Sequence, residues 1–147
     1  MLKTEPGDSA PRHYNRGLDL IAEGKIKEGI EELHKAARLD PGDAAALCEI
    51  GRIEIERDRL DSAVRFLEEA LSRDPEHPGT LNNRGVAAFL SEQYQDAAEW
   101  FRSAVKADPE LADAWFNLAD SCEELGDTEG QKQAALRYRA LCDDNNP

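Results

Sequence analysis

A recurrence every 34 residues is the feature that most limits what this sequence can fold into. Asp-Pro dipeptides and glycines both keep that interval: Asp40-Pro41, Asp74-Pro75 and Asp108-Pro109; Gly17, Gly51 and Gly85, with Ala119 one interval further. A fixed period of this length is typical of a stack of similar supersecondary units, each of which buries its apolar face against its neighbours. We therefore expect a repeat architecture with an elongated core.

Each repeat holds two stretches with apolar residues at i, i+3, i+4 and i+7, which predicts amphipathic helices. The expected first helices are 11–23, 45–57, 79–91 and 113–125, and the second helices are 27–39, 61–73, 95–107 and 129–141. Short connections between them favour antiparallel hairpins. The predicted repeats are 10–43, 44–77, 78–111 and 112–142, with a flexible leader at 1–9 and a loose tail at 143–147.

The recurring glycines require a packing reason, because glycine inside a helix costs about 1 kcal/mol relative to alanine. The expected reason is close approach of the second helix, which carries small residues where it faces them: Gly29, Ala63 and Ala97, then Ala36, Ala70 and Ala104. Small residues on both helices allow an interaxial distance at the short end of the usual range.

The pattern resembles the tetratricopeptide repeat family, whose signature runs from a Leu-Gly pair through spaced alanines and an aromatic residue to a closing proline. The matching residues are Leu81, Arg84-Gly85, Ala88, Tyr94, Ala97, Phe101, Ala104 and Pro109; Leu47, Ile50-Gly51, Leu60, Ala63, Leu67, Ala70 and Pro75; Trp115, Leu118-Ala119, Leu125-Gly126 and Asp127. The resemblance implies an all-α fold, a right-handed α-solenoid of four 34-residue helix-turn-helix repeats. It is specific for fold and unspecific for function.

Three charged residues depart from the family pattern. Glu54 stands where a large apolar residue is usual, and Arg16 and Arg84 stand where leucine is usual. Because a buried unpaired carboxylate is costly, Glu54 either pairs with Arg84 or Arg16 or extends its charged end to solvent. The last helix, with a polar outer face over 128–141, is expected to cap the stack.

Composition excludes several classes of function. The net charge of -13 over 147 residues works against binding of nucleic acid, which depends on clustered Lys and Arg. No apolar run reaches the roughly 18 residues of a membrane span and no signal sequence is evident, so a cytoplasmic protein without membrane contact is expected. Cys48, Cys122 and Cys142 show no CxxC pairing, which predicts reduced thiols.

Catalysis has little support in the sequence. His13, His34 and His77 fall in different positions of the repeat, and no HExxH, GxSxG, GxxxxGK[ST] or GxGxxG motif is present. We therefore expect a protein that is not an enzyme, with no catalytic residue, metal or cofactor.

The resemblance implies that a peptide or a partner helix lies in a concave groove lined by the first helices. The candidate groove residues are Tyr14, Asn15, Leu18, Cys48, Glu49, Arg52, Asn82, Asn83, Val86, Phe89, Phe116, Asn117, Asp120 and Glu123. Asn15, Asn83 and Asn117 share one register, where an amide suits an extended peptide backbone or else bonds a neighbouring helix. The aromatic candidates either offer apolar pockets or belong to the core.

Charge indicates what kind of partner to expect. A subgroup of the family holds acidic chaperone tails with groove Lys, Asn and Arg residues, whereas this chain has Tyr14, Leu18, Glu49, Gly79 and Asn83 there, so chaperone-tail binding is not expected. The fourth repeat carries more acidic than basic residues, which favours a ligand with Lys or Arg toward that end.

The sequence thus favours a non-catalytic interaction scaffold or adaptor for a protein or peptide partner, present as a monomer or weak homo-oligomer. Two alternatives stay open. One is a structural module that self-associates, and the other is an accessory domain of a larger protein.

Overall fold

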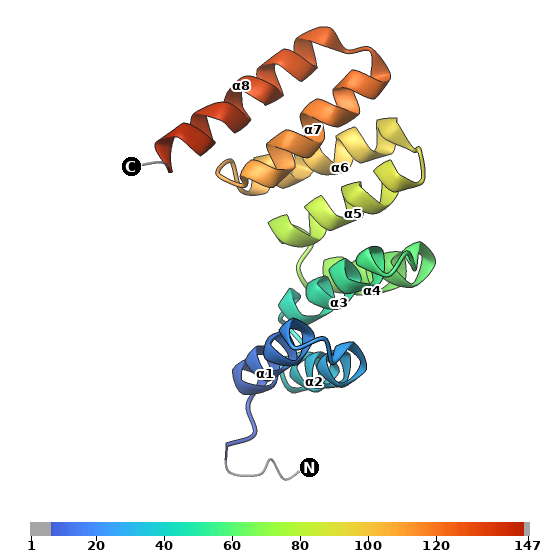
Figure 1. Cartoon of the computed structure of the whole chain (residues 1–147), viewed down its shortest axis with the longest axis vertical. Coiled ribbons are helices and arrows are strands. Elements are labelled where there is room, and N and C mark those ends of the chain that lie inside the picture. Colours follow the sequence, from blue (N-terminus) through green and yellow to red (C-terminus); the bar gives the residue numbers. More distant parts are fainter. Residues whose placement is uncertain (1–6, 146–147) are drawn as a thin grey trace. The chain divides into compact units, whose positions relative to one another are not determined.

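The computed structural model describes residues 7–145. The chain divides into two compact units, Met1–Pro75 and Glu76–Pro147. The first unit contains α1 (Ala10–Ala22), α2 (Ile26–Leu39), α3 (Ala45–Glu56) and α4 (Leu60–Arg73). The second contains α5 (Pro78–Leu90), α6 (Tyr94–Ala107), α7 (Ala112–Leu125) and α8 (Thr128–Asp144) (Figure 1). Within the described residues every regular element is a helix, so the all-α class expected from the sequence is confirmed.

The helix ends lie within one residue of those predicted, except at the end of α8. α8 continues to Asp144, so the predicted tail at 143–147 begins too early. No Pro or Gly interrupts the helix after Leu141, and the Asn145 side chain donates a hydrogen bond of 2.9 Å to the Leu141 carbonyl. At the other end, part of the predicted flexible leader is ordered: the Ser9 hydroxyl accepts a hydrogen bond from the Arg12 N–H and caps α1. Leader residues 1–6 lie outside the described part of the chain.

The turns inside the helix pairs share one backbone conformation. Gly24, Asp58, Glu92 and Gly126 all have positive φ, between 58° and 83°, and they recur at the repeat interval. This left-handed conformation suits glycine but is less favourable for Asp58 and Glu92.

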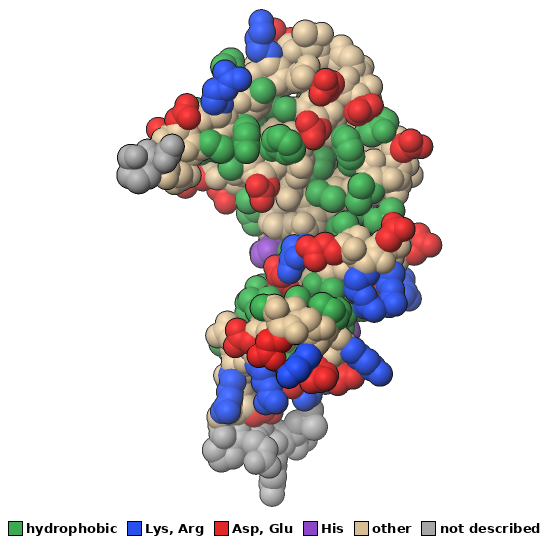
Figure 2. Space-filling model, viewed as in Figure 1, with side chains coloured by type: hydrophobic (Ala, Val, Ile, Leu, Met, Phe, Trp, Pro, Cys, Tyr) green, Lys and Arg blue, Asp and Glu red, His purple; other side chains and the backbone are tan. Residues whose placement is uncertain are grey.

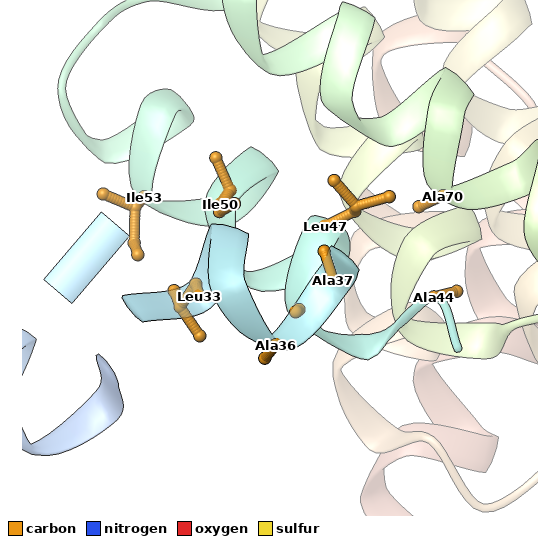
Figure 3. Packing of buried hydrophobic residues seen from close by; sticks show 9 residues of the cluster. Leu33, Ala36, Ala37, Ala44, Leu47, Ile50, Ile53 and Ala70 are labelled. Carbon is orange, nitrogen blue, oxygen red and sulfur yellow. The ribbon is translucent and has the colours of Figure 1, made fainter. Parts of the chain in front are cut away.

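In the first unit α1 packs on α2, α3 packs on α4, and α3 also packs on α2. Leu33 and Ala37 of α2 meet Leu47, Ile50 and Ile53 of α3 in one buried cluster (Figure 3). In the second unit α5 pairs with α6, α7 pairs with α8, and α7 packs on α6 and along a shorter stretch on α5. Within each unit, the first helix of the second pair therefore packs on the pair before it: α3 in the first unit and α7 in the second.

The glycine positions have a different packing reason from the one predicted. A Cβ added at Gly85 would lie 2.5 Å from the ring of Phe101, and one at Gly51 would lie 2.5 Å from the side chain of Leu67. A Cβ added at Gly17 would lie 2.9 Å from the side chain of Leu33 and 3.0 Å from the carbonyl of Gly29, so here a small residue of α2 is also in close approach. The glycines therefore make room mainly for large side chains of the second helix.

A contact that the sequence did not indicate joins α4 to the turn between α2 and α3. The Arg73 guanidinium donates to the backbone carbonyls of Ala37, Asp43 and Asp40, at 2.8, 3.2 and 3.3 Å. Ala37 lies in the last turn of α2, where carbonyls have no partner within the helix, so this arginine supplies a donor to it.

Glu54 is paired, but with a residue that the sequence did not suggest. Its side chain is buried and accepts a hydrogen bond of 2.9 Å from Arg57, just past the end of the same helix. Arg16 is exposed on α1. Pairing with Arg84, which belongs to the second unit, stays a prediction.

Candidate partner-binding surface

Four predicted groove residues come together in the second unit, from consecutive first helices. Val86 and Phe89 of α5 and Asn117 and Asp120 of α7 line one pocket. Leu90 and Phe101 complete this pocket, which we call the α5–α7 pocket and which has a volume of about 60 Å³. The Phe89 ring also meets Tyr94 edge-on at 5.1 Å, so it serves both the pocket and the packing of α5 on α6.

The asparagine register makes a bond between neighbouring helices. The Asn117 amide donates to the Asn82 side-chain oxygen of α5 at 3.0 Å. This bond fixes the orientation of both amides, of which Asn117 lines the α5–α7 pocket. Asn83, the third-repeat member of that register, is half-buried on α5.

A second, wider pocket lies beside the first and shares Asp120 with it. Phe116, Ala119 and Asp120 of α7 line it together with residues of α8: Gln131, Ala135, Tyr138, Arg139 and Cys142. This α7–α8 pocket has a volume of about 380 Å³. Phe116 is 47% exposed and meets the Tyr138 ring at 5.2 Å, so it is not part of the core.

The carboxylate between the two pockets is partly removed from water. Burial, followed by the nearby charge of Glu123, raises the pKa of Asp120 above its ordinary value of 3.8. Glu123 itself is exposed one turn further along α7. Hydrophobic side chains gather on the visible face of the second unit with acidic side chains beside them (Figure 2).

In the first unit the predicted groove residues separate into two groups. Tyr14 and Asn15 of α1 line a pocket of about 260 Å³ with Ala36 and Ala37 of α2. Burial, and then the charge of Glu49, raises the pKa of the Tyr14 phenol. Leu18, on the same helix, is half-buried.

The predicted groove residues on α3 are largely engaged with one another. The Arg52 guanidinium contacts Glu49 at 2.9 Å and Glu56 at 2.6 Å, so its charge is neutralised within the helix. Cys48 is only 5% exposed, and its prediction as a groove residue is wrong. A small apolar thiol is favoured in the core, where it packs without an obligatory hydrogen bond.

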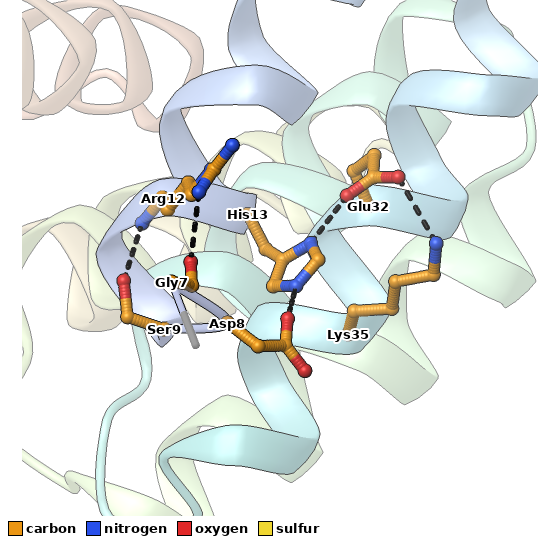
Figure 4. A network of polar contacts seen from close by, with 7 residues as sticks. All are labelled: Gly7, Asp8, Ser9, Arg12, His13, Glu32 and Lys35. Carbon is orange, nitrogen blue, oxygen red and sulfur yellow. Dashed lines mark hydrogen bonds and ion pairs between the residues drawn. The ribbon is translucent and has the colours of Figure 1, made fainter. Parts of the chain in front are cut away.

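A cluster around His13 was not indicated by any sequence motif. Its Nδ1 meets a Glu32 carboxylate oxygen at 2.5 Å, its Nε2 meets Asp8, and Lys35 donates to Glu32 at 3.0 Å (Figure 4). These contacts, first with Glu32 and then with Asp8, raise the pKa of His13, while His13 lowers the pKa of Glu32. The two carboxylates meet opposite nitrogens of the ring, so they do not converge on one ion. No group of His, Cys, Asp and Glu side chains within residues 7–145 is placed to hold a metal.

The family model of the tetratricopeptide repeat matches residues 14–78, 48–112 and 102–146. The chain belongs to the tetratricopeptide repeat family. Among its relatives is the photosystem I assembly protein Ycf3 of Sorghum bicolor, 30% identical over 126 residues, which are 81% of this chain and 68% of that protein. A heat-shock protein cognate co-chaperone of Aspergillus fumigatus, sgt12, is 32% identical over 84 residues, 57% of this chain. This chain spans a quarter of the length of that co-chaperone.

Solved structures of the same fold are more distant in sequence. In the Cut9–Hcn1 hetero-tetramer of the APC/C, one chain superimposes with a TM-score of 0.82 at 21% identity, over 92% of this chain and 27% of that one. At this identity the likeness concerns the fold alone. Of the helices within the described residues, none is long and apolar enough to cross a membrane.

Proposed function

We propose that this tetratricopeptide repeat protein is a non-catalytic interaction scaffold that holds a segment of a partner protein on the α5–α7 surface. In this proposal an apolar side chain of the partner enters the α5–α7 pocket and a Lys or Arg lies beside Asp120. The observation that carries the proposal is that Val86, Phe89, Asn117 and Asp120, from two consecutive first helices, line one pocket.

The size and chemistry of this pocket favour a protein segment over a small metabolite. At about 60 Å³ it is far below the roughly 300–1,000 Å³ of small-molecule sites, but it admits the end of one side chain. The Asn117 amide, which lines the pocket, can offer a donor and an acceptor to a peptide backbone. Asp120, whose charge is poorly solvated, gains most from a cation at that point.

The relatives support the same general role. One of them is named as a co-chaperone and another as an assembly protein, and a structural neighbour belongs to a hetero-tetramer. Chaperone-tail binding is still not expected for this chain, because the residues at the clamp positions include Leu18, Glu49 and Gly79. An acidic tail would meet one carboxylate, Glu49, and no cation at these positions.

The test is affinity capture from a lysate of the source organism with three versions of the full chain: the wild type, Val86→Lys and Gln95→Lys. Val86→Lys fills the pocket and places a cation beside Asp120. Gln95→Lys makes the same gain in charge on an exposed position of α6. Circular dichroism first establishes that all three versions are equally helical.

We expect one protein to be retained by the wild type and by Gln95→Lys and to be lost from Val86→Lys. A synthetic peptide from that protein, with an apolar and a basic residue, then reproduces the binding. Capture of the same proteins by all three versions would place the binding surface elsewhere.

A further inference from the structure

The α7–α8 pocket lies on a face that other helix pairs of this protein have covered. Counting back one repeat from Ala119, Ala135 and Tyr138 leads to Gly85, Phe101 and Ala104 in the α5–α6 pair. All three of those residues are buried, under α7 as it packs on α6 and α5. In the first unit the corresponding Leu33 and Ala36 are buried under α3.

The same face of the α7–α8 pair is open. Ala119, Ala135 and Tyr138 are half-buried, and Phe116 is exposed beside them. The predicted polar cap is therefore incomplete: Lys132, Gln133 and Arg137 are exposed on α8, but an aromatic and small-residue surface stays in register with the covered ones. The open face of the α7–α8 pair therefore corresponds, one repeat later, to the face of the α5–α6 pair on which α7 packs.

The helices that cover such a face share a sequence pattern. On α3 the covering residues are Ala46, Ile50 and Ile53, which share a buried cluster with Leu33 and Ala36. The same repeat positions on α7 hold Ala114, Leu118 and Ser121, which are also buried. Both sets are spaced i, i+4 and i+7, with a small residue first and a larger aliphatic residue second. This spacing lets one side of a helix lie close to the pair beneath it.

The first helix of another copy does not fit this face. At the corresponding positions α1 carries Arg12, Arg16 and Asp19, which are exposed and charged. Seating α1 on the α7–α8 pocket would remove three charged side chains from water at positions that are small or aliphatic on α3 and mostly so on α7. A head-to-tail stack of copies is therefore not what this face is built for.

We propose that the α7–α8 face seats a helix of a partner protein, with a small, an aliphatic and a small or aliphatic residue at i, i+4 and i+7 and a basic residue beside Asp120. The position of the basic residue follows from the repeat register. Val86, which corresponds to Asp120, shares its pocket with Asn117 and Asp120 of the next first helix. A residue at the place of Asp120 on the incoming helix therefore lies near Asp120 of this chain. This surface is separate from the α5–α7 pocket apart from Asp120.

The probe for this inference is a fluorescein-labelled peptide of residues 112–125 with Asp120→Lys. It carries the covering residues of α7, and a side-chain staple on its opposite face holds it helical, because isolated helices of this length are marginal in water. Its binding to the full chain is measured by fluorescence polarisation. The protein variants are Ala135→Arg, in the middle of the face, and the matched control Ala140→Arg, at an exposed position of α8 outside the pocket.

We expect saturable binding to the wild type and to Ala140→Arg, and at least tenfold weaker binding to Ala135→Arg. Asp120→Asn, a smaller change that keeps the shape of the side chain, is expected to weaken binding several-fold. A probe that does not bind saturably, or that binds Ala135→Arg as tightly as the wild type, would overturn the inference.

Two further outcomes would contradict it in a defined way. Loss of probe binding in Val86→Lys, but not in Ala135→Arg, would mean that the helix occupies the α5–α7 pocket, so the inference fails while the proposed function survives. If sedimentation shows that the wild type alone dimerises and Ala135→Arg is a monomer, the face is covered by a second copy instead of a partner helix.

Discussion

At the scale of single residues, the least expected feature is His13 between two carboxylates. No sequence motif indicates this arrangement, but Glu32 of α2 and Asp8 before α1 both contact its ring. His34, in contrast, packs against Phe66 at 5.4 Å and is partly buried, and burial and Arg38 outweigh the charge of Glu69 in setting its pKa. Two histidines of one helix pair therefore have opposite electrostatic surroundings.

This contrast predicts opposite shifts in an NMR titration of the histidine ring protons. The carboxylate contacts raise the pKa of His13 above its ordinary 6.5, and burial followed by the charge of Arg38 lowers the pKa of His34 below that value. Glu32→Gln should bring His13 down toward 6.5 and leave His34 unchanged. Equal titration of the two rings in the wild type would contradict the prediction.

The same shifts fix the pH window of stabilisation by this cluster. A raised pKa on His13 contributes stability that is complete below pH 6.5 and is lost as pH rises through the folded value. A lowered pKa on Glu32 contributes stability that is present above pH 4.5 and is lost as pH falls through its folded value. The cluster therefore stabilises the fold most between about pH 4.5 and 6.5. The urea concentration at the midpoint of unfolding should rise when the pH is lowered from about 8.5 to about 5.5, and this rise should be smaller for Glu32→Gln than for the wild type.

A second residue-scale prediction concerns Gly85. The added methyl group of Gly85→Ala would lie 2.5 Å from a ring atom of Phe101, which is buried and cannot turn away. The gain in helix propensity is about 1 kcal/mol, whereas overpacking a core costs typically 1–3 kcal/mol. We expect a net loss of up to about 2 kcal/mol in the free energy of unfolding, measured by urea denaturation. A variant more stable than the wild type would show that the α5–α6 contact is looser than the structure has it.

At the scale of the helices, each pair is stabilised by its own packing, but the turn between α2 and α3 depends on a third element. Arg73, at the end of α4, donates to three carbonyls around that turn, and its side chain is 16% exposed. The Asp-Pro motif predicts where the chain turns but not what satisfies the carbonyls of the turn.

Arg73→Ala should therefore lower stability more than the loss of an ordinary surface arginine. It leaves partly buried carbonyls without their charged donor, and hydrogen bonds to charged groups contribute about 1.5–3 kcal/mol. We expect Arg73→Lys to recover only part of the loss, because all three bonds come from Arg73 Nη1 and the shorter lysine side chain does not place its ammonium at that point. Arg65→Ala, at an exposed position of the same helix, is the control, and an equal effect of the two alanine variants would refute the role of Arg73.

At the scale of the whole molecule, the net charge of -13 is the dominant property. The fourth repeat contributes unevenly to it, with Asp113, Asp120, Glu123, Glu124, Asp127, Glu129, Asp143 and Asp144 against Lys132, Arg137 and Arg139. Such a distribution speeds the encounter with basic ligands and sets their orientation more than it adds affinity.

Binding of the partner segment should accordingly weaken with salt. Between about 0.05 and 0.5 M NaCl the Debye length falls from roughly 14 to 4 Å, and we expect a several-fold rise in Kd, mostly through slower association. Stopped-flow measurement of the association rate of the captured partner's peptide at each salt concentration checks this. In the Asp120→Asn variant the rate should depend less on salt. Binding that is independent of salt would contradict the assigned role of charge.

The sequence by itself determined the fold class and the helices. The 34-residue interval, the apolar spacing and the Asp-Pro turns are local or periodic signals, so they predicted the helix ends within one residue from α1 to α7. It also indicated that Val86, Phe89, Asn117 and Asp120 share one side of the first helices, because residues that share a register lie on the same side of successive repeats.

Only the tertiary structure decided which of these side chains meet and which are buried. Cys48 has the same register as Phe116, yet one is buried and the other exposed, since burial depends on what covers each helix pair. Likewise, Arg73 reaches a turn about 30 residues earlier, and Asn117 meets Asn82 across two helices. Such contacts depend on the rotamers of long side chains and on packing between helices, and neither leaves a periodic trace in the sequence.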